Sequence, residues 1–151
     1  MLYNNAIVDT ETPIYSSDIS DVEQWFGFSF PESVRKHYLA FNGGRPLRNL
    51  FRKDDEYFQI QEFLPIKHGK KGCLFEDTYQ DLVVGTPEFP DYLMPIAIDP
   101  GGDYYCVSVR PDDAGCMYCH MHEYYDDPSR SVAFMAASIA EFLNGMVEVE
   151  E

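Results

Sequence analysis

The sequence predicts an α+β fold in a single domain spanning residues 1–151, and three observations lead to this prediction. Two helical patterns come early in the chain, a run of short strand patterns follows, and an amphipathic helical pattern closes it. A chain of this length buries roughly two-thirds of its unfolded surface, which is enough for one core without disulfides.

The first helix is predicted over residues 20–28, "SDVEQWFGF". Val22, Trp25 and Phe26 share one face at helical spacing, which indicates a side turned toward a core. Ser20 is placed to cap the first turn, with a glutamate three residues later to complete a capping box.

The second helix is predicted over residues 30–44, "FPESVRKHYLAFNGG". Its apolar residues recur at i, i+4 and i+7, and Pro31 suits a first helical turn. We expect the helix to stop at residues 42–44, Asn-Gly-Gly, because these residues adopt the left-handed cap conformation readily.

The middle of the chain gives weaker patterns. Residues 45–55 are basic and irregular, whereas residues 56–66 alternate polar and apolar side chains in the manner of a strand. Residues 67–72 read as a loop. Residues 73–84 roughly fit a helix, and the sequence leaves this segment ambiguous.

An antiparallel meander of three strands is predicted over residues 92–124. The segments "YLMPIAID", "YYCVSVR" and "CMYCHMHEY" are rich in β-branched and aromatic residues, and the turns "PGGD" and "PDDAG" separate them. Strand patterns divided by Pro, Gly and Asp clusters are typical of hairpins in sequence.

The segment 128–146 is predicted as one terminal helix that covers the sheet. Its start is assigned to Ser129 or Ser131 and its end to the neighbourhood of residues 144–145. One apolar stripe runs along it, formed by Val132, Met135, Ile139, Leu143 and Met146. We expect the first ~17 residues to be peripheral, together with the acidic end that carries Glu148, Glu150 and Glu151.

Charge narrows the class of partner. The chain has 11 Lys and Arg against 26 Asp and Glu, a net charge of −15, which repels phosphate backbones and attracts cationic surfaces. Nucleic acid is therefore not expected as a partner. Residues 35–71 run against this trend, with nine basic and four acidic residues. Apart from its effect on solubility, this basic segment could meet an acidic partner or a second copy of the chain in a homo-oligomer.

The N-terminus predicts a cytoplasmic protein. It has neither a basic start nor an apolar run, and no segment approaches the ~18 apolar residues of a membrane span. We therefore expect no membrane partner. In a reducing compartment the four cysteines are expected to be free thiols or metal ligands.

Residues 115–128, "GCMYCHMHEYYDDP", are the densest group of chemically active side chains. They contain Cys-x-x-Cys-His and His-x-His, built from Cys116, Cys119, His120 and His122. Haem attachment is disfavoured because no export signal precedes it. Zinc binding needs ligands that converge, whereas successive side chains of a strand alternate faces, so the two cysteines would point in opposite directions.

A structural interpretation of this strand is favoured over a metal site. Met117, Cys119 and Met121 would fill the core side, since free cysteine behaves as a small hydrophobe and methionine fills irregular gaps. His120 and His122 share a face and could hold a metal with carboxylate help, but a second Cys-x-x-Cys is absent. We predict no metal, no cofactor and no catalytic residue.

Several motifs, taken in order, carry a family resemblance. The helix "FPESVRKHYLAFNGG", the segment "LMPIAIDPGGDYYCVSV", part of the third strand and the closing "AEFL" resemble the signature of the SUKH superfamily. That superfamily includes the Smi/Knr cell-wall assembly regulators of fungi and many bacterial immunity proteins. The matching positions are Phe30, Pro31, Tyr38, Leu39, Asn42, Gly43, Gly44, Leu93, Pro95, Ile96, Asp99, Gly101, Gly102, Asp103, Cys106, Tyr118, His122, Glu123, Ala140, Glu141, Phe142 and Leu143. The likeness spans roughly residues 18–145; Phe30 stands where leucine is usual, and His120 where tryptophan is usual.

The resemblance implies a curved, mostly antiparallel sheet with flanking helices, and a non-catalytic immunity protein. Such a protein binds and neutralises a bacterial polymorphic or contact-delivered toxin, often a nuclease or deaminase. The charge favours the same function, because a strongly acidic protein is steered quickly toward the basic groove of a nucleic-acid-cutting toxin. The expected toxin-binding residues are Asp99, Asp103, Glu123, Tyr124, Tyr125, Asp126 and Asp127.

Other interpretations of these residues remain open. Tyr124 and Tyr125 could add contact area at low entropic cost, or they could simply pack at the start of the terminal helix. The chain could instead be a regulatory adaptor of the cell-wall regulator type, although it lacks the long disordered extensions of such regulators. A small metal or thiol enzyme using the Cys116–His122 cluster is the third hypothesis.

Overall fold

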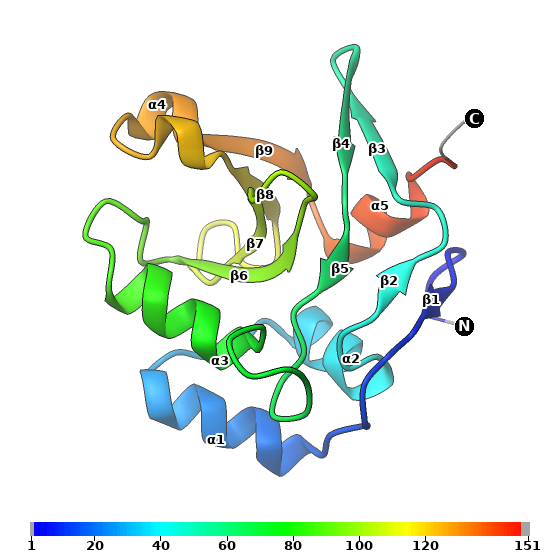
Figure 1. Ribbon diagram of the computed structural model, residues 1–151, viewed down its shortest axis with the longest axis vertical. Coiled ribbons are helices and arrows are strands. Elements are labelled where there is room, and N and C mark those ends of the chain that lie inside the picture. The colour runs from blue at the N-terminus through cyan, green and yellow to red at the C-terminus, as the bar shows by residue number, and fades with distance from the viewer. Residues whose placement is uncertain (1, 149–151) are drawn as a thin grey trace.

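A five-stranded antiparallel sheet forms the centre of the computed structural model, which describes residues 2–148 (Figure 1). The strand order is β5-β6-β7-β8-β9. The strands are β5 (Glu62–Phe63), β6 (Leu93–Ile98), β7 (Tyr104–Ser108), β8 (Met117–His120) and β9 (Val132–Ala136). The predicted meander is confirmed as β6, β7 and β8, and the α+β fold class is confirmed with it. The third strand, predicted to run to residue 124, ends at His120.

Two smaller antiparallel pairs flank this sheet. Strand β1 (Ile7–Val8) pairs with β2 (Arg45–Pro46), and β3 (Leu50–Lys53) pairs with β4 (Glu56–Gln59). The prediction that residues 45–55 are irregular is therefore wrong. Asp54 and Asp55 both have positive φ, 51° and 66°, which gives the two-residue turn that matches the twist of a hairpin. The predicted strand 56–66 is divided between β4 and β5.

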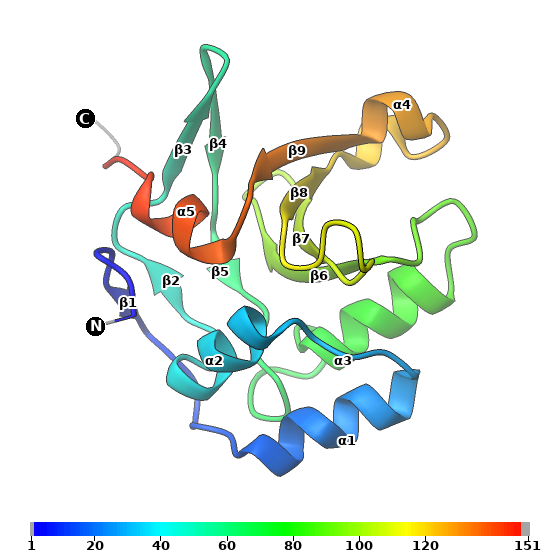
Figure 2. The same cartoon turned by 180° about the vertical axis from the view of Figure 1, so that it is seen from behind.

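Three helical segments pack below the sheet in both views (Figures 1 and 2). They are α1 (Ser16–Phe26), α2 (Glu32–Ala40), and α3 (Phe75–Thr78) continued by the π-helix η1 (Tyr79–Val84). The ambiguous segment 73–84 is thus largely helical. Helix α1 begins before the predicted Ser20 because the Asp18 carboxylate accepts the Tyr15 amide at 2.8 Å, which closes the first turn.

Asn42 ties three parts of the chain together. Its buried amide group donates to the carbonyls of Thr12 and Ile66, and its Oδ1 accepts the Ile66 amide at 2.7 Å. Gly44 follows at φ 85°, where an added Cβ would lie 2.7 Å from the Val8 carbonyl oxygen. Residues 42–44 were expected to be a left-handed helix cap, but α2 already ends at Ala40, and the motif instead joins the N-terminal segment to the sheet.

The predicted terminal helix over residues 128–146 is wrong in conformation. The segment forms α4 (Pro128–Ser131), strand β9 and α5 (Ile139–Asn144). Pairing of β9 with β8 supplies backbone hydrogen bonds that a helix would otherwise provide, and Ser138 caps α5 by accepting the Glu141 amide at 3.0 Å. Four residues of the predicted stripe are nevertheless buried, namely Met135, Ile139, Leu143 and Met146.

The first seventeen residues, expected at the periphery, supply Tyr3, Asn5 and Ile14 to the buried interior. Tyr3 Oη hydrogen-bonds to Nδ1 of the buried His37 at 2.9 Å. At the other end Glu148 is exposed, whereas Glu150 and Glu151 lie outside the described residues. Within residues 2–148 no helix is both long and apolar enough to cross a membrane.

Candidate functional site: two acidic surfaces

Strand β8, which carries the Cys-x-x-Cys-His motif, turns one face into the main core. Met117 and Cys119 are 0% and 1% exposed and pack in the main apolar cluster, and Met121 packs against its edge. The predicted orientation of these three side chains is confirmed. Burial raises the pKa of the Cys119 thiol to about 12, so at neutral pH it is neither a thiolate nucleophile nor a ready metal ligand.

The opposite face of β8 lies against a second, smaller cluster. His120 is 4% exposed, and its ring centroid lies 4.4 Å from that of Phe89. Phe89 packs there with Leu93 and Cys106. Burial lowers the pKa of His120, and its Nε2 has no hydrogen-bond partner among residues 2–148. This histidine is therefore a packed aromatic side chain whose contact with Phe89 holds the loop after η1 to the sheet.

The four residues of the Cys116–His122 cluster do not converge. Cys119 and His120 point to opposite faces of β8, Cys116 precedes the strand, and His122 follows it in the 3-10 helix η2 (His122–Tyr124). Within residues 2–148 no three His, Cys, Asp or Glu side chains gather in a way that could hold a metal ion. The separation of Cys119 from His120 follows from the alternation of side chains along a strand.

Asp103 joins the β6–β7 turn to the segment after β8. Its Oδ1 accepts two hydrogen bonds from His122, one from the backbone amide at 3.0 Å and one from Nδ1 at 2.6 Å. Asp99 in turn accepts the amides of Gly101 and Asp103 at 2.9 and 2.8 Å. The structure thus brings the two predicted regions, residues 99–103 and 122–127, side by side, with two of the aspartates fixing the backbone.

The segment after β8 presents its charges to solvent. Glu123 and Asp126 are exposed, and Tyr125 is 53% exposed. Tyr124 is half-buried, with the Arg130 guanidinium 4.0 Å above its ring. Asp127 caps α4 by accepting the Ser129 amide at 3.1 Å. We call the seven predicted residues the acidic surface: Asp99, Asp103, Glu123, Tyr124, Tyr125, Asp126 and Asp127.

A second surface was missed by the sequence analysis. Trp25 was expected on the buried face of α1 with Val22 and Phe26, but its side chain is 75% exposed. The inward face is set by Ile19, Val22 and Phe26 at i, i+3 and i+7, and Trp25 falls on its solvent edge. The signal available in the sequence was a single tryptophan beside acidic residues at the end of a short helix.

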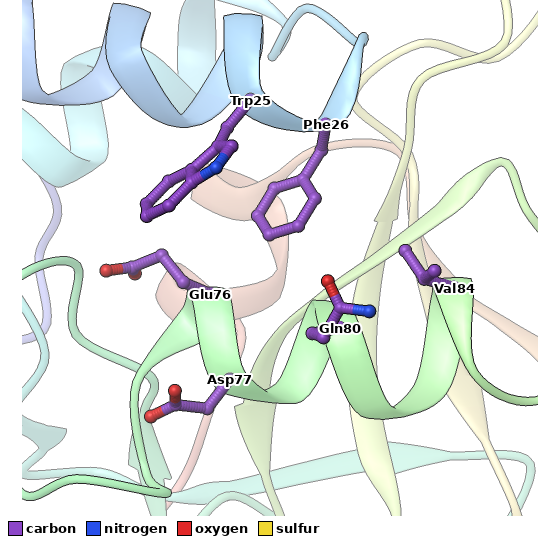
Figure 3. A pocket seen from close by; sticks show the side chains of 6 residues that line it. All are labelled: Trp25, Phe26, Glu76, Asp77, Gln80 and Val84. Atoms are coloured by element: carbon purple, nitrogen blue, oxygen red, sulfur yellow. The ribbon is translucent and has the colours of Figure 1, made fainter.

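Trp25 stands between two hollows, which together we call the Trp25 groove. The larger, about 440 Å³, lies between α1 and α3–η1 and is lined by Trp25, Phe26, Glu76, Asp77, Gln80 and Val84 (Figure 3). The smaller, about 190 Å³, is lined by Asp18, Asp21, Val22, Trp25, Ile66, Lys67 and Glu76. Glu76 therefore lines both.

The fold is that of a small acidic α+β domain, and its two candidate binding sites, the acidic surface and the Trp25 groove, both lie on the protein surface. The chain belongs to the SMI1 / KNR4 family (SUKH-1), whose model matches residues 13–145. This confirms the resemblance to the SUKH superfamily. Comparison with curated proteins found no match.

Proposed function

We propose that the chain is a non-catalytic immunity protein that neutralises a bacterial polymorphic or contact-delivered toxin in the cytoplasm. The toxin domain, a nuclease or deaminase, is bound through the acidic surface, which covers its basic or active-site face. Membership of the SMI1 / KNR4 family supports a role in protein–protein interaction. The observation that carries the proposal is the pairing of Asp103 with His122, which holds the two acidic segments next to each other.

The charge of the chain and the fixed backbone of the acidic surface both favour tight covering of the toxin. A net charge of −15 steers the chain toward a cationic groove, and long-range attraction of this kind raises association rates by about tenfold or more at low salt. Exposed Glu123, Tyr125 and Asp126 then provide contacts at short range. Because Asp103 and Asp127 already hold the backbone, little conformational entropy remains to be lost on binding.

Co-expression tests this function. The test uses a toxin domain encoded by a gene next to that of this chain, where the genome carries one. The domain is expressed in a sensitive bacterium, with or without the chain, and growth is measured. We expect the chain to restore growth. We expect rescue to fail for the variant E123K/D126K/D127N, in which asparagine retains the capping oxygen of residue 127.

The matched control is E11K/E32K/E141Q, which makes the same change in formal charge at exposed positions in the N-terminal segment, α2 and α5, away from the acidic surface. Full rescue by the control and none by the first variant would support the assigned surface. Equal rescue by both variants would place the contact elsewhere. Failure of the unaltered chain to rescue would overturn the immunity function itself.

A further inference from the structure

The Trp25 groove has the composition of a protein-docking site. Trp25 is 75% exposed and Val84 56% exposed, and Phe26 lies between them at the edge of the core (Figure 3). Large apolar side chains this exposed cost free energy in water, and tryptophan is the residue type most enriched at interaction hot spots. The groove occurs where α1 meets the π-helix η1, and π-helical turns are rare and frequently found at functional sites.

The rim of the groove selects a cationic partner. Its lining includes four carboxylates, those of Asp18, Asp21, Glu76 and Asp77, against a single lysine. That lysine, Lys67, is already paired with Asp18 at 2.9 Å. Asp21 is exposed and has no ion pair among residues 2–148. Of these four carboxylates only Asp18 forms an ion pair among residues 2–148, so the apolar floor is bordered by excess negative charge.

Glu76 adds a hydrogen-bond acceptor that is not fully used. Its Oε2 accepts the Lys67 amide at 3.0 Å, whereas its Oε1 is buried without a partner among the described residues. A buried carboxylate oxygen without a donor is costly, and the same burial raises the pKa of Glu76. Since Glu76 lines both hollows beside Trp25, a donor that enters either hollow approaches this carboxylate.

We infer that the Trp25 groove binds a segment of a partner protein that presents an arginine next to an aliphatic side chain. The guanidinium stacks on the indole of Trp25 and donates to Glu76 and Asp21, and the aliphatic group contacts Phe26 and Val84. Arginine fits better than lysine, because its planar group stacks on an aromatic ring and donates to two carboxylates at once. This surface is distinct from the acidic surface, and the inference does not require the partner to be a toxin.

Trp25 is the only tryptophan in the chain, so its fluorescence reports on this groove directly. The probe is a short, acetylated and amidated helical peptide with leucine, arginine and leucine on one face at i, i+3 and i+4. In the control peptide citrulline, which has nearly the same shape but no charge, replaces arginine. We expect a saturable change in Trp25 emission with the arginine peptide, and affinity at least about tenfold weaker with the citrulline peptide.

Variants of the chain locate the binding. Calorimetry should show loss of peptide binding in Trp25→Ala, and affinity several-fold weaker in Asp21→Asn and in Glu76→Gln, which keep the side-chain shape. Tyr57→Ala is the matched control, because Tyr57 is 59% exposed on β4 and lines neither hollow. It should bind the peptide as the unaltered chain does.

Three results would overturn the inference. One is the absence of a saturable emission change with the arginine peptide, and another is equal binding of the arginine and citrulline peptides. The third is a dimer of the free chain in sedimentation that Trp25→Ala converts to a monomer, because the groove would then be covered by a second copy. None of these results bears on growth rescue, which depends on the acidic surface.

Discussion

Strand β8 and the segment 122–127 that follows it are adjacent in sequence but differ in what their side chains do. In β8, Met117, Cys119 and His120 are all buried, on two faces of the sheet. In the next segment Glu123, Tyr125 and Asp126 are exposed. Cys119 and His120, the two residues of the metal-like or haem-like motif that lie in β8, are therefore packing residues, while the residues suited to binding begin where the strand ends.

Shortening a core residue of β8 should have the largest effect on stability. Met117→Ala removes most of a fully buried side chain and should lower the free energy of unfolding by about 2–5 kcal/mol, measured by urea denaturation. Tyr125→Ala, in the exposed segment, should change it by less than about 0.5 kcal/mol. Comparable losses in both variants would remove the distinction between the two regions.

The buried histidine of α2 should make stability depend on pH. Burial lowers the pKa of His37 to about 3, so the folded state keeps it neutral while the unfolded state protonates it below about 6.5. The unfolded state then binds more protons, and the free energy of unfolding should fall by up to about 1.4 kcal/mol per pH unit as pH drops below 6.5.

The double variant Y3F/H37F tests this origin, because it replaces both hydrogen-bonded partners by apolar rings of similar shape. Its unfolding free energy should vary less with pH between about 6.5 and 4. Some slope should remain, since burial also lowers the pKa of His120. An unchanged slope in Y3F/H37F would assign the effect to other groups; Y3F alone should keep the slope of the unaltered chain.

Removing the hydrogen bonds between Asp103 and His122, which join the two acidic segments, should have an intermediate effect on the free energy of unfolding. Asp103→Ala removes the acceptor for both His122 donors and should cost about 1 kcal/mol, with faster hydrogen exchange of the His122 amide. Asp112→Ala, at an exposed position in the β7–β8 turn at the other end of β7, is the control and should change neither quantity. If His122 exchanges at the same rate in both variants, Asp103 does not hold the segment.

The fold was predictable where local pattern and tertiary context agree. The meander β6–β8 and helix α2 follow from alternation, turn residues and helical spacing. The conformation of the C-terminal segment could not be predicted, because Met135, Ile139 and Leu143 also fit one helical stripe. The pairing of β9 with β8 is a long-range interaction that no local spacing reveals. The turn at Asp54-Asp55 was missed because it lacks the glycine of common hairpin turns.

Parts of the candidate sites could also be predicted from the sequence. Strand alternation correctly separated Cys119 from His120, and the charges of residues 123–127 marked a polar segment. The contact of Asp103 with His122 depends on how turns close in space and could only be suggested. Trp25 was predicted on the buried face of α1 for two reasons. Helical spacing defines a face only to within one residue at its edge, and tryptophan is highly buried on average.

Removing Trp25 should have the smallest effect on stability. Because the indole is mostly exposed, Trp25→Ala should change the free energy of unfolding by less than about 0.5 kcal/mol. In the unaltered chain acrylamide should quench Trp25 fluorescence nearly as efficiently as it quenches free tryptophan. A protected indole, or a loss of stability comparable to that of Met117→Ala, would mean that Trp25 belongs to the core.

The most direct test of the acidic surface is the association rate of the chain with a toxin domain whose growth inhibition the chain relieves, measured by stopped flow at low and high salt. For the unaltered chain and for E11K/E32K/E141Q the rate should be high at low salt and fall as salt screens the attraction. For E123K/D126K/D127N it should be lower by about tenfold or more and depend little on salt. Equal rates and equal salt dependence for the two variants would contradict the claim that these carboxylates guide binding.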